Sequence, residues 1–474
     1  MVEQSQVRPG RVLAVLSAAS FLAGLDLFIV NVAFTDIGRD FAGRPMADLS
    51  WVLNGYAIVF AALLVPLGRL ADRYGRRRGL VAGLVVFTVA SQACASAPSL
   101  WWLVAFRVVQ AVGAAALIPT SLGLLLAAYP ATRRAGAVRI WSASAAVAAA
   151  AGPAVGGVLV DLSWRWVFEI NIPLGIILTL LALRLVPDSR EGTTARVPDL
   201  PGTVALTTAI ALLALGLVKI NDWPGQRTAL TLAAALLGLT WFWLRSRRHP
   251  APVIEPSLLA VRTFSWSNAT ILLFSVAFAA NLLLGVLWMQ QIWHYSPIRT
   301  GLAVAPGPLM VPIMAIVAGR LAARRMPAGL ITAVGCMLCA LGVVMIAMSL
   351  GPAPAYLSGL LPGWLIGGAG VGLALPTILS AAAVDLPSHR YATGSAVVTM
   401  SRQIGTVLGV SLAVAILGTP HGHPDAHIGY LHAWLMVAGF MAIAAIAALG
   451  MNPRRLRPSP TVPDTETEVI AGTS

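Results

Sequence analysis

The sequence has few charged residues: Asp, Glu, Lys and Arg make up 11% of its 474 residues, whereas soluble domains carry roughly 25%. Hydrophobic residues make up 58%, and the mean hydropathy is +0.82. So little charge cannot cover a soluble fold, which means that most of the chain faces lipid. In lipid the backbone must bond within helices or closed barrels. The alternating ten-residue segments of a barrel are missing, so the sequence predicts an all-α membrane protein.

Groups that bind metals and nucleotides are also scarce. The three cysteines lie in apolar runs, at Cys94, Cys336 and Cys339, and no further ligands stand near the CxxC to complete a zinc site. A second group of residues able to bind a metal is found late in the chain: His421, His423 and His427. We expect these histidines in a solvated loop. No Walker A motif is present. We therefore expect no metal, no cofactor and no ATP hydrolysis.

Fourteen apolar segments are long enough to cross a bilayer, which takes about 20 residues. They are Val12–Phe34, Trp51–Leu70, Leu80–Ala97, Trp101–Ala127, Val138–Val160, Val167–Val186, Thr203–Ile220, Thr228–Leu244, Phe264–Trp288, Gly301–Gly319, Leu330–Leu350, Leu357–Ala383, Gly394–Gly418 and Leu431–Gly450. No soluble segment is large enough to hold a separate activity.

The arginines indicate how these segments are oriented. Lys and Arg concentrate in the cytoplasmic loops of membrane proteins. With the N-terminus inside, the inner segments hold 21 arginines and the outer loops hold 5. We therefore predict an inner-membrane protein with both termini in the cytoplasm. The net charge of +14 is then a signal of topology and not of nucleic-acid binding.

An internal repeat divides the chain. GRLADR at 68–73 returns as GRLAAR at 319–324, 251 residues later, and six spans repeat at a similar spacing. The seventh and eighth spans have no counterpart. We predict a six-helix bundle at 1–186, a linker with an inserted helix pair at 187–262, a second six-helix bundle at 263–451 and a disordered tail at 452–474. Parallel six-helix repeats place a site at their interface in alternating-access transporters.

Six motifs in the expected spans name a family. They are Gly68–Arg77, Leu25–Ala33, Arg107–Ala115, Gly152–Gly157, Trp164–Gly175 and Ser401–Gly405. With them the chain resembles the fourteen-span drug:proton antiporters of the major facilitator superfamily. Ala111 and Ala148 stand where that family usually has glycine, and we expect these small side chains to preserve the packing. The resemblance implies the major facilitator fold, with fourteen transmembrane helices.

Asp26 is the only acid near the centre of a span, where a carboxylate costs about 2.5–3.5 kcal/mol. Burial favours its protonated form, so we interpret it as a proton site that is neutral when sealed and ionised when wet. A purely structural hydrogen bond to a neighbouring helix is the alternative. Arg107 shares a helix face with Gln110, and the resemblance implies that Arg107 takes part in proton coupling. Its alternative is snorkelling to the outer surface.

The basic loop after the second span is the candidate inner gate, with Gly68, Asp72, Arg73, Gly75 and Arg76 as its motif residues. Plain positive-inside charge or binding of anionic lipid are the alternatives. In the family, an arginine of this loop often pairs with an acid at the end of helix four, but residues 127–133 contain none. We hypothesise instead that Asp72 accepts hydrogen bonds from the start of helix thirteen, at 393–395.

The fifth span carries the residues of the antiporter motif that the resemblance implies. Pro153 removes a helical hydrogen bond and kinks the helix. Gly152 and Gly156 form a GxxxG that lets a neighbouring helix approach, and Gly157 follows. Without the resemblance, the pattern indicates only a kinked and closely packed helix.

Few polar residues are available for a substrate cavity. On the helices that line it by resemblance we single out Asn31, Gln110 and Asn281 beside Arg107, with Trp364 as an aromatic wall. Two further charged residues lie near span ends. For Glu169 we favour a surface pair with Arg165 over a second proton site. For Arg402 we expect snorkelling to the cytoplasm.

The best interpretation is a proton-coupled antiporter that exports amphipathic small molecules. We expect its partners to be a small-molecule substrate, protons and membrane lipids, and we expect a monomer that does not bind nucleic acid. A proton-coupled importer or facilitator of a small metabolite on the same fold is the first alternative. The second is a membrane enzyme acting on lipids, which would need an acid/base pair or metal cluster that the sequence does not show.

Overall fold

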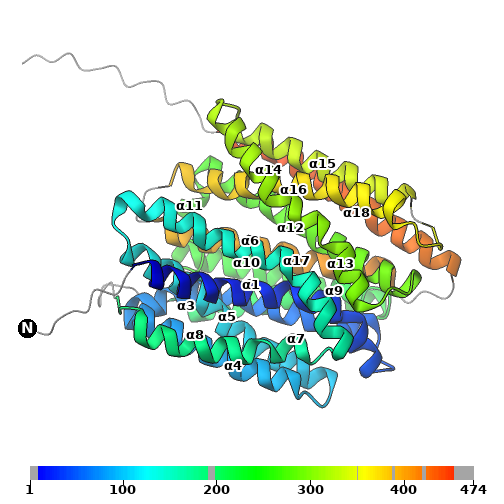
Figure 1. Cartoon of the computed structure of the whole chain (residues 1–474), viewed down its shortest axis with the longest axis horizontal. Coiled ribbons are helices and arrows are strands. Elements are labelled where there is room, and N and C mark those ends of the chain that lie inside the picture. The colour runs from blue at the N-terminus through cyan, green and yellow to red at the C-terminus, as the bar shows by residue number, and fades with distance from the viewer. Residues whose placement is uncertain (1–8, 190–197, 350, 387–389, 419–422, 453–474) are drawn as a thin grey trace, which may run out of the picture.

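The structure, a computed structural model, describes residues 9–189, 198–349, 351–386, 390–418 and 423–452. All regular elements in these ranges are helical, and the helices run side by side along the long axis of the molecule (Figure 1). Within the same ranges, 14 spans are long and apolar enough to cross a membrane. The predicted all-helical membrane protein with fourteen spans is therefore confirmed. The expected tail lies almost wholly outside the described residues.

The N-terminal bundle consists of the helices that precede residue 189. They are α1 (Pro9–Asp40), α2 (Met46–Leu49), α3 (Trp51–Tyr74), α4 (Arg76–Ala95), α5 (Leu100–Ala128), α6 (Ala131–Leu162), α7 (Trp166–Glu169) and α8 (Asn171–Leu185). Gly75 separates α3 from α4 and has a φ of 119°, a conformation that residues with a side chain rarely adopt. The chain therefore reverses within one residue at this point.

The inserted pair is a hairpin of α9 (Leu200–Val218) and α10 (Gly225–Arg248). Asp199 joins its two helices, because its carboxylate accepts from the Gly202 N–H at 3.0 Å and pairs with Arg245 at 2.8 Å. At the opposite end, Lys219 pairs with Asp48 at 2.8 Å. Burial lowers the pKa of Lys219, but the bonds and charges of its acidic neighbours outweigh burial and hold that pKa above its ordinary value. The lysine therefore stays charged at neutral pH.

The C-terminal bundle consists of the remaining helices. They are α11 (Pro256–Leu259), α12 (Arg262–Leu287) with a π-turn at Trp288–Ile292, α13 (Pro297–Val304), α14 (Pro306–Ala323), α15 (Ala328–Ser349), a π-turn at Tyr356–Leu360 that leads into α16 (Leu361–Val384), α17 (Tyr391–Leu417) and α18 (His423–Ala448). Helix α17 begins at Tyr391, so the Ser395 N–H lies inside the helix. This corrects the expected start of helix thirteen at 393–395.

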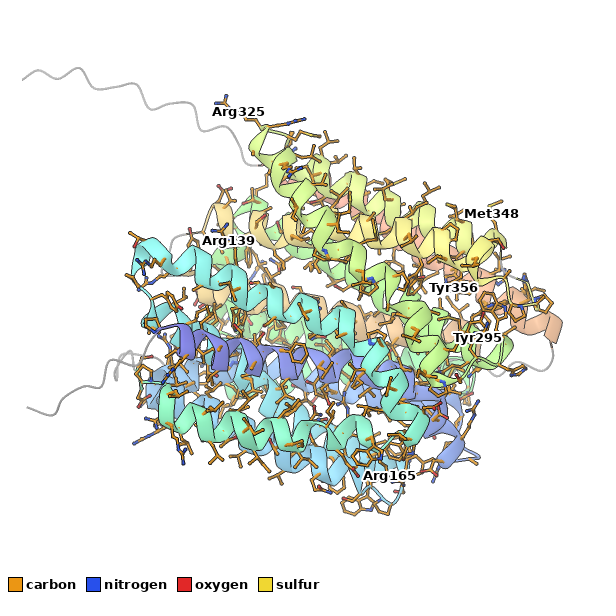
Figure 2. All side chains as sticks on the ribbon, in the orientation of Figure 1. Arg139, Arg165, Tyr295, Arg325, Met348 and Tyr356 are labelled. Atoms are coloured by element: carbon orange, nitrogen blue, oxygen red, sulfur yellow. The ribbon has the colours of Figure 1, made fainter. Side chains whose placement is uncertain are left out.

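The molecule has two distinct ends. We call the end at which α1 begins the basic end, and the opposite end the far end. In Figure 2, Arg139 and Arg325 lie toward the basic end, whereas Arg165 and Tyr295 lie at the far end. Three connections belong to the basic end: Gly75 between α3 and α4, residues 129–130 between α5 and α6, and residues 324–327 between α14 and α15.

The two bundles are joined in their far halves. The Asn54 side chain of α3 donates to the Ser411 hydroxyl of α17 at 3.1 Å. The Gln290 amide donates to the Val32 carbonyl of α1 at 3.1 Å. The rings of Phe28 and Phe278 meet edge to face with centroids 6.5 Å apart. The structure therefore has its far end closed.

Candidate functional site

The centre of the candidate site is a buried ion pair inside the N-terminal bundle. Arg107 on α5 donates from Nη1 to Oδ2 of Asp26 on α1 at 2.6 Å. The side chain of Asp26 is 0% exposed and that of Arg107 is 1% exposed. The alternative that Arg107 snorkels to the outer surface is therefore wrong, because its guanidinium turns inward to the acid.

Two amides complete the shell of the Asp26 carboxylate. Gln110 donates to Oδ1 at 2.8 Å, and Asn171 of α8 donates to the same oxygen at 3.0 Å. The Gln110 carbonyl oxygen in turn accepts from Arg107 at 2.6 Å, and its amide also lies 2.8 Å from the Ser91 hydroxyl of α4. Three helices, α1, α5 and α8, therefore meet at one carboxylate, and Gln110 links them to a fourth, α4. We call these five side chains the Asp26 network.

Arg107 also has contacts outside the Asp26 network. Its Nε donates to the Val52 carbonyl of α3 at 3.2 Å. Its guanidinium lies 4.0 Å from the ring centre of Tyr56 and 5.7 Å from that of Phe168, at cation–π distance. These contacts bring a fifth helix into the site and hold the arginine rigidly.

The Asp26 carboxylate is buried among donors. Three side chains donate hydrogen bonds to its two oxygens, and the Asp26 side chain is 0% exposed. The acid that the sequence marks as a candidate proton site is therefore sealed from bulk solvent in this structure.

Sequence reasoning missed three members of the site: Ser91, Tyr56 and Asn171. Asn171 lies within the Trp164–Gly175 motif, which marked the segment but not this side chain. Ser91 and Tyr56 are uncharged residues in apolar helices, and no pattern distinguishes them from structural neighbours.

The antiporter motif on α6 packs on two sides. Gly152 lies against Phe28 and Gly156 against Ile29, both on α1, where a Cβ would come within 2.7 Å and 2.9 Å of those side chains. A Cβ on Gly157 would lie 2.7 Å from the Pro297 carbonyl of α13. The Pro153 carbonyl similarly leaves no room for a side chain at Gly301 of α13. The motif therefore lets α6 join α1 to the opposite bundle at the far end.

Alanine at position 148, where the family usually has glycine, is accommodated by a neighbouring helix. The Ala148 methyl group lies 3.1 Å from the Cβ position of Gly24 on α1. The two helices thus still approach closely, because the partner position is a glycine. Ala111 is 0% exposed in the core of the N-terminal bundle.

The candidate inner gate is held together locally at the basic end. Asp72 pairs with Arg76 at 2.6 Å, and the Arg76 side chain lies over Gly123 of α5. Gly68 packs against Pro119 of α5, where a Cβ would lie 3.0 Å from the proline Cβ. Arg73 lies 5.7 Å from the ring centre of its neighbour Tyr74.

A linker acid approaches the same loop. Arg69 pairs with Glu255 at 3.0 Å and donates to the Pro252 carbonyl at 2.8 Å. Sequence reasoning did not find this pair. Glu255 stands out in the linker between the hairpin and α12, but its partner lies 186 residues earlier in the chain.

The candidate cavity residues are distributed differently from expectation. Gln110 belongs to the Asp26 network. Asn31 donates to the Leu27 carbonyl of its own helix at 3.1 Å, and the Asn281 side-chain oxygen is buried without a hydrogen-bond partner. Trp364 donates to the Val304 carbonyl at 2.8 Å and is 7% exposed. It packs against glycines of α12 and α14, so it is a wedge between helices and not an open wall.

The expected surface pair of Glu169 is wrong. Arg165 instead pairs with Asp40 at 2.8 Å, an oxygen that also accepts from the Trp164 indole at 2.9 Å. Glu169 is half-buried and lines a far-end pocket with Trp166. In the described part of the chain, no group of three or more His, Cys, Asp or Glu residues could hold a metal. His421 and the side chain of His423 lie outside that part.

Comparisons with known proteins agree with this architecture. A family model described as the Major Facilitator Superfamily matches residues 16–410. The class is therefore a multi-pass membrane transporter of small molecules, and not an enzyme. The chain belongs to the major facilitator superfamily.

Similar curated proteins are named as exporters or resistance proteins. The multidrug resistance protein Stp of Mycobacterium tuberculosis is 34% identical over 84% of this chain and 74% of that protein. The cephamycin export protein CmcT of Amycolatopsis lactamdurans is 33% identical over 92% of this chain and 90% of that protein. The puromycin resistance protein of Streptomyces alboniger is 32% identical over 92% and 90%.

Solved structures share the fold at low identity. A peptide transporter in complex with sulfate has a TM-score of 0.67 at 16% identity, covering 93% of this chain and 94% of that one. A bacterial homolog of the lysosomal transporter Spinster, in an inward-facing and occupied conformation, also has a TM-score of 0.67 at 16% identity, covering 93% and 96%.

Proposed function

We propose that the protein is a proton-coupled antiporter that exports amphipathic small molecules across the inner membrane. The observation that carries the proposal is the Asp26 network, in which the one acid near mid-span is paired with an arginine of another helix. The names of the similar exporters support drug or antibiotic efflux. The arginine bias supports a basic end that faces the cytoplasm.

The geometry suggests how a proton would drive the cycle. Protonation of Asp26 removes its charge and weakens its attraction to Arg107. That pair holds α1 against α5, and Asp26 lies less than one turn from Phe28 and Ile29. These two residues pack on the glycines of the antiporter motif on α6, which joins the far end. Proton binding would therefore loosen α1 where it supports the closed far end.

The test is transport in vesicles with an imposed pH gradient. Asp26→Asn should abolish uphill efflux, because the coupled proton loses its site. A matched control is Asp48→Asn, which removes an acid outside the network and should retain efflux. Proton-driven export by a folded Asp26→Asn protein at the wild-type rate would reject the proposal.

Folding must be separated from function in this test. Removing one partner of a buried ion pair costs about 3–5 kcal/mol, so Asp26→Asn leaves Arg107 uncompensated. The double variant Asp26→Asn/Arg107→Gln removes both charges and should recover thermal stability. It should still fail to couple export to the pH gradient.

A further inference from the structure

Helix α17 carries polar side chains along one face. Spacings of four, three and four residues place them on one side of the helix, and we call them the polar stripe: Ser395, Thr399, Arg402 and Thr406. Ser395 is exposed, and the other three are half-buried. Further along the same face, Val410 and Ala413 are buried at 2% and 0% exposure. The face therefore opens toward the basic end and closes toward the far end.

Part of this side of α17 is also used for packing. Gly405 and Gly409, three and seven residues after Arg402, lie against α12, where a Cβ on Gly405 would come within 2.8 Å of the Ser275 Cβ. Ser411 bonds to α3, and the Ala415 carbonyl accepts from Asn221 of the inserted hairpin at 2.6 Å. The polar side chains of the stripe form none of these contacts. An arginine facing lipid is costly, so a half-buried arginine at this position is expected to have a polar or anionic partner.

Arg402 has no counter-ion. Among the described residues, its guanidinium forms neither a salt bridge nor a hydrogen bond, and its only bond is a backbone one, from the Thr406 hydroxyl to its carbonyl at 3.1 Å. The acid at comparable depth, Asp26, is already paired with Arg107. Arg402 lies eleven residues after the start of α17, about 16 Å along the axis, which is deeper than the eight residues on which the snorkelling expectation rests.

We propose that Arg402 binds an anionic group of the transported molecule, and that the substrates are amphipathic acids or zwitterions with a carboxylate. A guanidinium offers paired N–H donors that match a carboxylate. The hydroxyls of Thr399 and Thr406, one turn away on either side, donate to the Ser395 and Arg402 carbonyls, so the guanidinium is the donor that this stripe offers to a carboxylate. The inference rests on the proposed export function only in that the bound molecule is the one transported.

Labelling with charged thiol reagents tests whether the electrostatic potential at the polar stripe is positive. A cysteine at Thr399 should react from the aqueous phase faster with the anionic sulfonatoethyl methanethiosulfonate than with the cationic trimethylammonioethyl reagent. Cys94, Cys336 and Cys339 are buried, and the parent chain measures their background. Arg402→Gln should lower the anion-to-cation rate ratio about tenfold, whereas Arg402→Lys should keep it. An unreactive Thr399→Cys, or a ratio that Arg402→Gln leaves unchanged, would overturn the proposal.

Binding to purified protein tests the substrate class. Carboxyfluorescein and rhodamine 6G share a xanthene ring but differ in charge. Arg402→Gln should raise the Kd of carboxyfluorescein at least tenfold and leave that of rhodamine 6G unchanged or lower, while Arg324→Gln, in a loop of the basic end, should change neither. Equal effects on both dyes, or wild-type protein that binds rhodamine 6G but not carboxyfluorescein, would contradict it. If neither dye binds, the anion-to-cation ratio of labelling rates at Thr399→Cys decides whether Arg402 forms an anion site.

These measurements need no proton gradient, so they separate the two proposals. Charge-selective binding that persists in Asp26→Asn, together with a wild-type protein that ignores the pH gradient, would reject proton coupling and keep the anion site. Proton-driven export by a protein that shows no charge selectivity would reject the anion site and keep proton coupling.

Discussion

At the scale of single residues, one buried ion pair organises much of the N-terminal bundle. The Asp26 carboxylate joins α1, α5 and α8 directly. Gln110 extends the contact to Ser91 of α4, and Arg107 extends it to α3. Such a pair stabilises little compared with a well-packed apolar core, but breaking it costs about 3–5 kcal/mol. That is a large part of a typical stability of 5–15 kcal/mol. The pair is therefore suited to a switch whose charge state changes the packing.

Gly75 is a residue whose replacement should act through the backbone alone. Its φ of 119° lies where only glycine is comfortable. Gly75→Ala should destabilise the turn between α3 and α4 by about 1–3 kcal/mol and lower the thermal midpoint of the purified protein. Gly319→Ala, near the equivalent motif of the second bundle, has open space around the new methyl group and should be neutral. Equal midpoints for both variants would contradict this account.

The residues that sequence reasoning found are those whose charge stands out in an apolar span. Asp26 and Arg107 are conspicuous for this reason, but their contact joins residues 81 positions apart and depends on helix packing. The pair between Glu169 and Arg165 was wrong for a different reason. The turn from Arg165 to Glu169 is helical, since the Arg165 carbonyl accepts from the Glu169 N–H at 3.1 Å, so the spacing itself was right. The Arg165 guanidinium instead pairs with Asp40 and lies 4.4 Å from the ring centre of Trp164, contacts that depend on packing and not on helical spacing.

At the scale of elements, α6 is the joint between the bundles. Its antiporter motif packs on α1 through Gly152 and Gly156, and on α13 through Gly157. At Gly157 the nearest atom is the Pro297 backbone carbonyl, whereas at Gly152 and Gly156 the nearest atoms belong to the Phe28 and Ile29 side chains. The sequence predicted close approach on this helix, but it could not show that the motif has a second partner in the other bundle.

Gly157→Leu should therefore prevent the far end from closing. The readout is the rate of cross-linking between cysteines at Asn54 and Ser411, whose side chains are 3.1 Å apart in the closed state. A short bifunctional thiol reagent should cross-link this pair readily in the parent chain and at least several-fold more slowly with Gly157→Leu. Gly136→Leu, on the same helix with open space around it, is the matched control. Unchanged cross-linking with Gly157→Leu would remove the motif from the joint.

Span number could be predicted from the sequence because length and hydropathy decide it, whereas span ends could not. The tenth predicted span began at Gly301, but the helices there are α13 and α14, which start at Pro297 and Pro306. Proline is favoured at the first turn of a helix, since its missing N–H has no partner there anyway. Reading these prolines as starts, and not as breaks, would have placed both boundaries.

At the scale of the whole molecule, orientation follows from charge. We predict that reporter fusions at Gly225, in the far-end turn of the hairpin, read as outside, and that fusions at Arg248 read as inside. The bias of arginine toward the basic end is the physical reason. Alkaline phosphatase and green fluorescent protein fusions measure the two sides. A reversed pattern, or both sites on one side, would show that α9 and α10 do not cross as a pair.

The last prediction concerns how the basic end closes when the far end opens. In this structure, with the far end closed, Asp72 accepts a hydrogen bond from Arg76. We predict that in the opposite state Asp72 moves to the start of α17, whose first four N–H groups, at 390–393, have no partner within the helix. A charge at a helix N-terminus is worth about 0.3–1 kcal/mol, enough to bias two states without locking either.

Asp72→Asn should then favour the state with the closed far end. Under a pH gradient that makes the state with the closed far end the minor one, the Asn54–Ser411 cross-linking rate should rise about two- to fivefold, which corresponds to that free-energy range. Asp188→Asn is the matched control, since this acid also lies at the basic end and accepts from the Arg77 N–H at 3.3 Å. Asp72→Asn also removes the pair with Arg76 that this structure holds. A rate that stays constant or falls would therefore mean that the contact of Asp72 with α17 is no stronger than its contact with Arg76, and that other contacts hold the basic end shut.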